Sequence, residues 1–161
     1  MENKCYNIIT KGGEKGEMAF FGTHSLQLDE KNRMRIPAKF RAKLGADFYI
    51  AYGAGGCLTI MPAESFGKFI APFSQIPASD LEARESVRRI LATVEQPEED
   101  SQGRFVLPQH CRAYASIDKK VVFVGVGENI EIWSEEKFAA KNIGEQDTFD
   151  KAVVLLAKYG L

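Results

Sequence analysis

The chain has 161 residues, with 21 lysines and arginines against 22 aspartates and glutamates, a formal net charge of −1 and 45% apolar residues. This length is enough for one domain, or two very small ones, with a real core. The near-neutral charge excludes a uniformly basic nucleic-acid coat and a polyacidic disordered tail. No stretch reaches the roughly 18 to 20 apolar residues of a spanning helix, and no signal-peptide core is present, so we expect a cytoplasmic protein with no membrane partner.

The side chains that most often carry catalysis or bind metals are few and scattered. Cys5, Cys57 and Cys111 are odd in number and far apart, which excludes a disulfide framework or a zinc site of ordinary spacing. His24 and His110 stand alone, and no nucleophile lies beside a base. The glycines of YGAGGC do not form a phosphate-binding fingerprint. The sequence therefore predicts a protein that is not an enzyme and has no metal, cofactor or small-molecule substrate.

An internal repeat organises the chain. The segment 29–33 (DEKNR) is followed by MRIP and then Arg41, and 71 residues later the segment 100–104 (DSQGR) is followed by FVLP and then Arg112. One extra residue in the second copy shifts the offset to 72, at which Gly53 matches Gly125, Ile60 matches Ile132 and Phe66 matches Phe138. The chain therefore contains two copies of one structural unit.

The first copy begins with an alternating segment at 20–28, which is typical of a half-buried strand. Residues 29–32 form a predicted turn, because Asn32 tolerates a positive φ and Gly103 holds the equivalent position. Alternation then places Met34 on the core face and Arg33 on the opposite face. The remaining predicted elements of this copy are a helix at 38–44 that ends at Gly45, a hairpin at 48–52 and 57–61, and a helix from Glu64.

Between the copies, residues 72–77 are a predicted linker, and Ser79 to Glu82 reads as a capping box that opens a helix to about Ala92. The second copy repeats the first as strands at 105–107, 121–124 and 130–133, with helices at 109–115 and from Glu135. Phe66, Phe69 and Ile70 are expected in the core. A last apolar stripe can dock on its own domain or on a neighbouring subunit; it comprises Phe149, Ala152, Val153, Leu156 and Tyr159.

Charge is strongly segregated along the chain. Residues 31–46 contain six cations and no acid, which leaves −7 for the rest of the chain. The equivalent window of the second copy carries only Arg104 and Arg112. A solvated helix face accounts equally well for Lys39 and Lys43. Arg33, by contrast, stands at the mouth of a turn, where a planar guanidinium can reach phosphate oxygens or guanine O6 and N7.

The strings LDEKNRMRIPAKFR, DSQGRFVLP and NIEIWS resemble the two signatures of the MraZ family, bacterial transcription regulators of the division and cell wall gene cluster. The resemblance covers about residues 18–141. It implies an α+β, mainly β fold of the AbrB-like (SpoVT-AbrB type) swapped-hairpin class, in which two repeats form a pseudo-twofold, β-barrel-like core with short peripheral helices. Asn32 replaces the glycine usual in the first motif, which is compatible with the turn but can tilt the loop.

The resemblance also implies a function. It implies sequence-specific binding to double-stranded promoter DNA at short direct repeats, repression of the protein's own gene cluster, a closed homo-oligomeric ring, and association with the nucleoid. Carried over by position, the critical motif arginine is Arg33, with Asp29 and Lys31 in the same turn and Asp100 and Arg104 in the second copy. The organisation that follows is a disordered extension at 1–17, repeats at 18–71 and 94–141, a linker and helix at 72–93, and a C-terminal helix at 142–161.

The candidate residues divide by chemistry. Arg33 is expected to contact a base edge, with Arg104 as a weaker equivalent, while Lys31 and Arg35 contact phosphate. Because aspartate repels phosphate, Asp29 and Asp100 are expected to brace the turns and the arginines. Arg41 and Arg112 are expected to be structural ion-pair partners. Two other functions remain open: an AbrB-like antitoxin, and a ring-forming assembly protein that binds no DNA.

Overall fold

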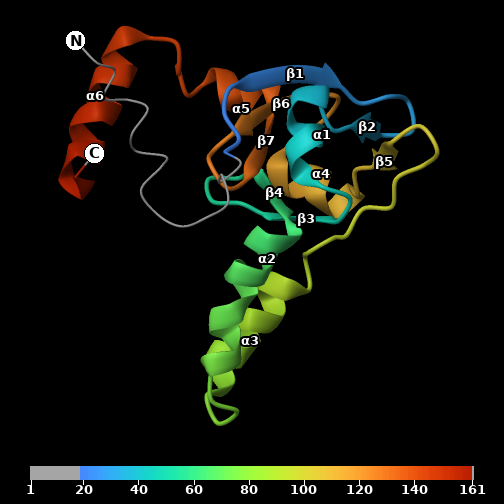
Figure 1. Ribbon diagram of the computed structural model, residues 1–161, viewed down its shortest axis with the longest axis vertical. Helices are drawn as coiled ribbons and strands as arrows, with labels where there is room; N and C mark the ends of the chain where they lie inside the picture. Colours follow the sequence, from blue (N-terminus) through green and yellow to red (C-terminus); the bar gives the residue numbers. More distant parts are fainter. Residues whose placement is uncertain (1–18, 161) are drawn as a thin grey trace.

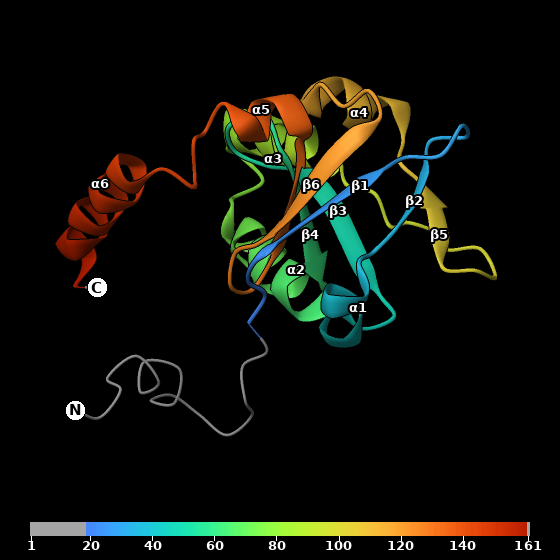
Figure 2. The same ribbon diagram turned by 90° about the horizontal axis from the view of Figure 1, so that it is seen from above.

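The computed structural model describes residues 19–160 and contains two antiparallel sheets (Figure 1). The larger sheet has five strands, in the spatial order β1 (Thr23–Gln27), β6 (Lys120–Gly125), β7 (Ile130–Ser134), β4 (Leu58–Pro62) and β3 (Phe48–Tyr52). The smaller sheet is a two-stranded ribbon of β2 (Arg33–Arg35) and β5 (Arg104–Val106), which lies at one end of the body in both views (Figure 2).

Besides the hairpins β3–β4 and β6–β7, which lie within one copy each, strands of the two copies pair with one another. β1 pairs with β6, β4 with β7, and β2 with β5, so each of these ladders joins the first copy to the second. The β2–β5 ladder is centred on Met34 and Phe105, and the β4–β7 ladder on Thr59 and Glu131, which are equivalent residues of the repeat. Since equivalent residues face each other in antiparallel ladders, a local twofold relates the paired segments.

The core lies between the large sheet and two equivalent helices, α1 (Ala38–Leu44) and α4 (Gln109–Ala115). The central strands bury Leu58, Ile60 and Ile132 completely, and α1 adds Phe40 at 2% exposure. Each such side chain contributes about 1.5–3 kcal/mol through removal of its apolar surface from water. Any other residue at Gly125 would force the backbone to move, because its Cβ atom would lie 2.2 Å from the backbone nitrogen of Phe21.

The last helix of the first copy and the helix that follows it form a hairpin that projects from the body (Figure 1). They are α2 (Ala63–Ile70), which continues into the 3-10 helix η2 (Ala71–Gln75), and α3 (Leu81–Leu91). The expectation that Phe66, Phe69 and Ile70 lie in the core was wrong: no residue of α2 is buried, although Phe66 stacks on Tyr49 at 4.0 Å between ring centroids. The hairpin projects beyond the sheet, so its apolar stripe is only partly covered.

Two local expectations in this segment also need correction. The predicted linker at 72–77 largely belongs to η2, since proline is compatible with the first turn of a helix and Pro72 stands there. The cap of α3 is Asp80 rather than Ser79: its carboxylate accepts a hydrogen bond from the Ala83 amide at 2.9 Å.

The C-terminal segment comprises α5 (Glu135–Ala139), α6 (Gln146–Leu156) and the 3-10 helix η3 (Ala157–Tyr159). Both views show α6 away from the body, on the side opposite the β2–β5 ribbon (Figures 1 and 2). Its apolar side chains are exposed, with Phe149 at 64% and Val153 at 53%. Of the two expected docking modes, the one on its own domain is therefore not adopted. Within residues 19–160, no helix is long and apolar enough to cross a membrane.

The fold class needs one correction. The chain is a mixed α and β protein with an antiparallel sheet, but that sheet is open, with β1 and β3 at its two edges, and does not close into a barrel. Helices also cover more of the described chain than strands do, so the expected predominance of β structure was wrong. The amphipathic hairpin α2–α3 and helix α6 account for the difference. The expected extension at 1–17 lies outside the described residues.

Candidate nucleic-acid interface

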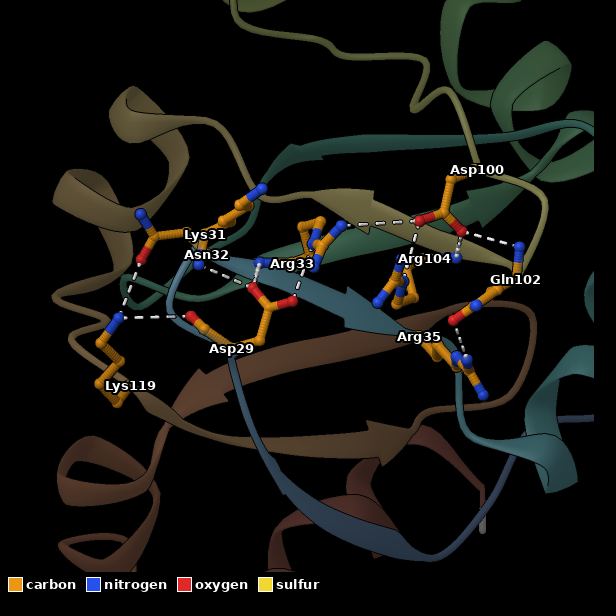
Figure 3. A network of polar contacts seen from close by, with 9 residues as sticks. All are labelled: Asp29, Lys31, Asn32, Arg33, Arg35, Asp100, Gln102, Arg104 and Lys119. Atoms are coloured by element: carbon orange, nitrogen blue, oxygen red, sulfur yellow. Dashed lines mark hydrogen bonds and ion pairs between the residues drawn. The ribbon is translucent and has the colours of Figure 1, made fainter.

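The first motif forms a turn that Asp29 holds together with both carboxylate oxygens (Figure 3). Oδ1 accepts hydrogen bonds from the backbone amides of Lys31 and Arg33, each at 2.9 Å, and Oδ2 accepts one from Arg33 Nε at 2.7 Å. The amide of Asn32 donates to the Asp29 carbonyl at 2.9 Å, which closes the turn. The aspartate therefore fixes the backbone of the turn and the position of the arginine guanidinium.

The second motif repeats this arrangement closely. Asp100 Oδ1 accepts from the amides of Gln102 and Arg104 at 2.9 and 3.0 Å, and Oδ2 accepts from Arg104 Nε at 2.8 Å. Asn32 and Gly103 occupy the same left-handed position, with φ of 57° and 71°. Since the bonds of the two turns match so closely, the replacement of glycine by Asn32 does not tilt the first loop.

Hydrogen bonding keeps both aspartates ionised. The amide of Arg33 is the main group that lowers the pKa of Asp29, and the amide of Arg104 does the same for Asp100, whose pKa falls to about 2. Each carboxylate is thereby committed to its turn and its arginine. A negative charge held in this way positions a cation and does not itself bind phosphate.

The β2–β5 ribbon brings the two turns together. Its inner face carries Met34 and Phe105, which are 3% and 2% exposed. Because residues opposite each other in an antiparallel pair share a face, the cross-strand pairs Arg33 with Val106 and Arg35 with Arg104 lie on the outer face. The ribbon therefore presents three arginines from two distant segments of the chain.

Contacts across the ribbon tie the two turns into one unit (Figure 3). The guanidinium of Arg33 lies between the two aspartates, with Nη1 3.9 Å from Asp100 Oδ2. Arg35 Nη2 donates to Gln102 Oε1 at 3.3 Å, which links the first strand to the second turn. A cleft of about 650 Å³ opens beside the ribbon and is lined by both motif arginines and by Arg41.

The structure places the other predicted residues as follows. Lys31 is exposed at the tip of the first turn. Arg41 Nη2 donates to Glu99 at 2.6 Å, an ion pair just before the second motif. Arg112 donates from Nε to the Leu107 carbonyl at 3.1 Å, and no acidic side chain of residues 19–160 forms an ion pair with it.

Several neighbours of the site could not be found from the sequence. Lys119 Nζ donates to the Asp29 carbonyl and to Asn32 Oδ1, each at 3.4 Å, and so adds a cation from the second copy to the first turn. Lys39 donates to the carbonyl of Thr23, at the start of β1, and Lys43 donates to the carbonyl of Ala19, ahead of that strand. The basic strip of residues 31–46 is thus divided between the ribbon and α1, and only its ribbon half lies on the outer face.

Residues 19–160 contain no group of His, Cys, Asp or Glu side chains that could hold a metal ion. Burial raises the pKa of Cys57 to about 11 and that of Cys111 to about 12, so these two thiols are protonated at neutral pH and unreactive. The geometry is that of a binding surface built from arginines and backbone turns.

As the pH falls, acid should release the second turn only after ordinary aspartates have been protonated. Asp100 has a pKa lowered from 3.8 to about 2, so its contribution is complete above about 3.8 and is lost as the pH falls through 2. NMR titration of the Gln102 and Arg104 amides should show a midpoint near 2, while far-UV circular dichroism follows the fold. Asp100→Asn should remove this transition. A midpoint at 3.8 would contradict the bracing role of Asp100.

Fold and site together define a two-repeat protein with an arginine-bearing β-ribbon braced by aspartates. The family model described as "MraZ protein, putative antitoxin-like" matches the chain twice, at residues 19–89 and 90–151. The chain belongs to the MraZ family.

Curated relatives support this assignment. The chain is 38% identical over 132 residues to the transcriptional regulator MraZ of Carboxydothermus hydrogenoformans, covering 82% of this chain and 92% of the relative. It is 40% identical to that of Mycoplasmopsis pulmonis, with coverage of 75% and 82%, and 39% identical to that of Leuconostoc mesenteroides, with coverage of 88% and 99%. These names describe regulators of transcription and not enzymes.

Proposed function

We propose that this chain is a sequence-specific DNA-binding transcriptional regulator that represses the promoter of its own division and cell wall gene cluster. In this proposal it acts in the cytoplasm on the nucleoid and binds short direct repeats as a ring-shaped homo-oligomer. The outer face of the β2–β5 ribbon, with Arg33, Arg35 and Arg104 side by side, is the observation that carries the proposal. The names of the relatives support a role in transcription.

A two-stranded ribbon with arginines on its outer face is the kind of element that binds in the major groove. B-DNA accommodates a two-stranded β-ribbon in this groove, where guanine offers O6 and N7 to an arginine. Asp29 holds Arg33 through Nε, and Asp100 lies 3.9 Å from Nη1, which is beyond hydrogen-bond distance, so the Nη groups can donate toward a base. Because the side chain is already held in place, less conformational entropy is lost on binding.

Lys31 should contact a phosphate group and should not discriminate between base sequences. It is exposed at the tip of the first turn, where its amide, not its side chain, is bonded to Asp29. Lys31→Ala should therefore weaken binding to promoter and scrambled duplexes alike and make the slope of log K against log salt shallower by about one. Fluorescence anisotropy at a series of salt concentrations measures both. A loss confined to the promoter duplex would instead assign Lys31 to a base.

The exposed apolar stripe of α6 supports assembly from several copies. Phe149, Val153 and Leu156 lie along one side of this helix and are 64%, 53% and 46% exposed, and α6 does not pack on its own body. Val153→Glu should lower the mass of the oligomer, measured by size-exclusion chromatography with light scattering. Val154→Glu, on the opposite side of the same helix, is the matched control. An unchanged mass for both variants would place the subunit contact elsewhere.

The proposal is tested by binding the full chain to a duplex from the region upstream of its own gene and to a scrambled duplex of the same composition. We expect tighter binding to the promoter duplex and a steep salt dependence, because phosphate contacts release counterions. An antitoxin is a second candidate, favoured by the description of the family model; it would bind DNA and also capture a toxin encoded beside it. Absence of specific, salt-dependent binding would favour a pure assembly protein.

A further inference from the structure

The outer face of the β2–β5 ribbon is not symmetric, although the backbone is. Arg33 and Arg104 occupy equivalent positions of the repeat, 71 residues apart, and each is held by its own aspartate. At the same offset, the position equivalent to Arg35 is Val106. The ribbon thus offers two arginines on one strand and an arginine and a valine on the other.

Val106 is an apolar side chain that lies on the surface and does not contribute to the core. It is 55% exposed, whereas its neighbours Phe105 and Leu107 are 2% and 0% exposed and supply the core. Its cross-strand partner is Arg33, the residue that we assign to a base edge. Side chains opposite each other in such a pair have Cβ atoms roughly 4.5–5.5 Å apart, so the two lie on the same patch of surface.

The chemistry of valine restricts what it can contact in the major groove. Its side chain has no donor or acceptor, so it cannot bind phosphate or the polar edge of a base. The apolar group in this groove is the C5-methyl of thymine. With base pairs stacked about 3.4 Å apart, a side chain next to the one that contacts a guanine reaches an adjacent base pair.

We propose that Val106 reads sequence by packing against the C5-methyl group of a thymine close to the guanine that Arg33 contacts. This inference rests on the proposed DNA-binding function and deepens it. It gives each ribbon a polar half, with Lys31, Arg33 and Arg35, and a mixed half, with Arg104 and Val106. A ribbon whose two strands carry different side chains binds an asymmetric DNA sequence. Such sequences are arranged as direct repeats more readily than as palindromes.

The test is a double-mutant cycle between the protein and the DNA. In the upstream duplex, each thymine of the segment protected by the wild-type chain is replaced in turn by deoxyuridine, which lacks only the methyl group. One such replacement should weaken wild-type binding about fourfold, because it removes one methyl group that is buried against Val106. The same replacement should have no effect on Val106→Ala, whose binding should already be weaker by a similar factor.

Controls separate this inference from the function on which it rests. Val126→Ala, at an exposed valine between β6 and β7, should retain the full sensitivity to deoxyuridine. If wild-type protein binds the promoter specifically and no deoxyuridine replacement couples to Val106, the inference fails and the proposed function stands. If the wild-type chain shows no preference for the promoter duplex, both fail. Circular dichroism confirms that Val106→Ala is folded.

Discussion

Replacing Arg33 by alanine should abolish specific binding to promoter DNA and leave fold and oligomer unchanged. The side chain is 26% exposed and is bonded within its own turn by Asp29, so its loss removes no core contact. Loss of a bidentate arginine–guanine contact costs about 1–3 kcal/mol of discrimination per site. In an oligomer that contacts several repeats at once, losses of this size multiply across sites. Fluorescence anisotropy measures the loss, and light scattering checks the oligomer.

Two matched variants sharpen this expectation. Arg33→Lys keeps the charge but not the planar fork, so it should retain binding to scrambled DNA and lose the preference for the promoter. Arg104→Ala should be milder, because the second copy carries Gln102 and Val106 where the first has Lys31 and Arg35. Undiminished specificity of Arg33→Ala, or equal losses from Arg33→Ala and Arg104→Ala, would contradict the assigned roles.

The largest effect on stability is expected from Phe105→Ala. Phe105 lies at the centre of β5, is 2% exposed and meets Phe48 edge to face, with ring centroids 5.8 Å apart. Its removal leaves a cavity beneath the ribbon and should lower the free energy of unfolding by about 3–5 kcal/mol. This is a large share of the roughly 5–15 kcal/mol that a domain possesses. Denaturant unfolding followed by circular dichroism gives the value.

Phe105→Leu is the matched control for this loss. It keeps much of the volume and should cost far less than the alanine variant, so it separates cavity formation from loss of the aromatic ring. DNA binding by Phe105→Leu should remain close to that of the wild type, because the outer face of the ribbon is unchanged. A small effect of Phe105→Ala would mean that the ribbon is not anchored on the core through this residue.

Local structure was largely predictable from the sequence because the signals are local. The turn at Asp29 required a residue that tolerates positive φ at position 32, and Asn32 adopts a φ of 57°. Alternation placed Met34 inside and Arg35 outside, which the burial of these residues confirms. Helices α1 and α4 begin and end at the predicted residues. In each case, side chains within a few positions decide the backbone.

Pairing and exposure were not predictable in the same way. Nothing local indicates that β1 pairs with β6, or that Lys119 reaches a turn 90 residues earlier in the chain. The stripe of α2 has the periodicity of a core helix, yet the helix projects from the body and its Phe69 is 36% exposed. Periodicity identifies an apolar face but not the surface that covers it, which depends on how distant segments pack.

The pairing of strands between copies has a consequence for how the chain folds. The first copy alone can form the β3–β4 hairpin, but β1 and β2 lack the strands that they pair with until the second copy has been synthesised. Such a topology has a high contact order and folds more slowly than one built from local contacts. During synthesis, the first half therefore remains an incomplete sheet until the second half emerges from the ribosome. A protein made of one half alone would need a second molecule to supply the missing strands, as a dimer.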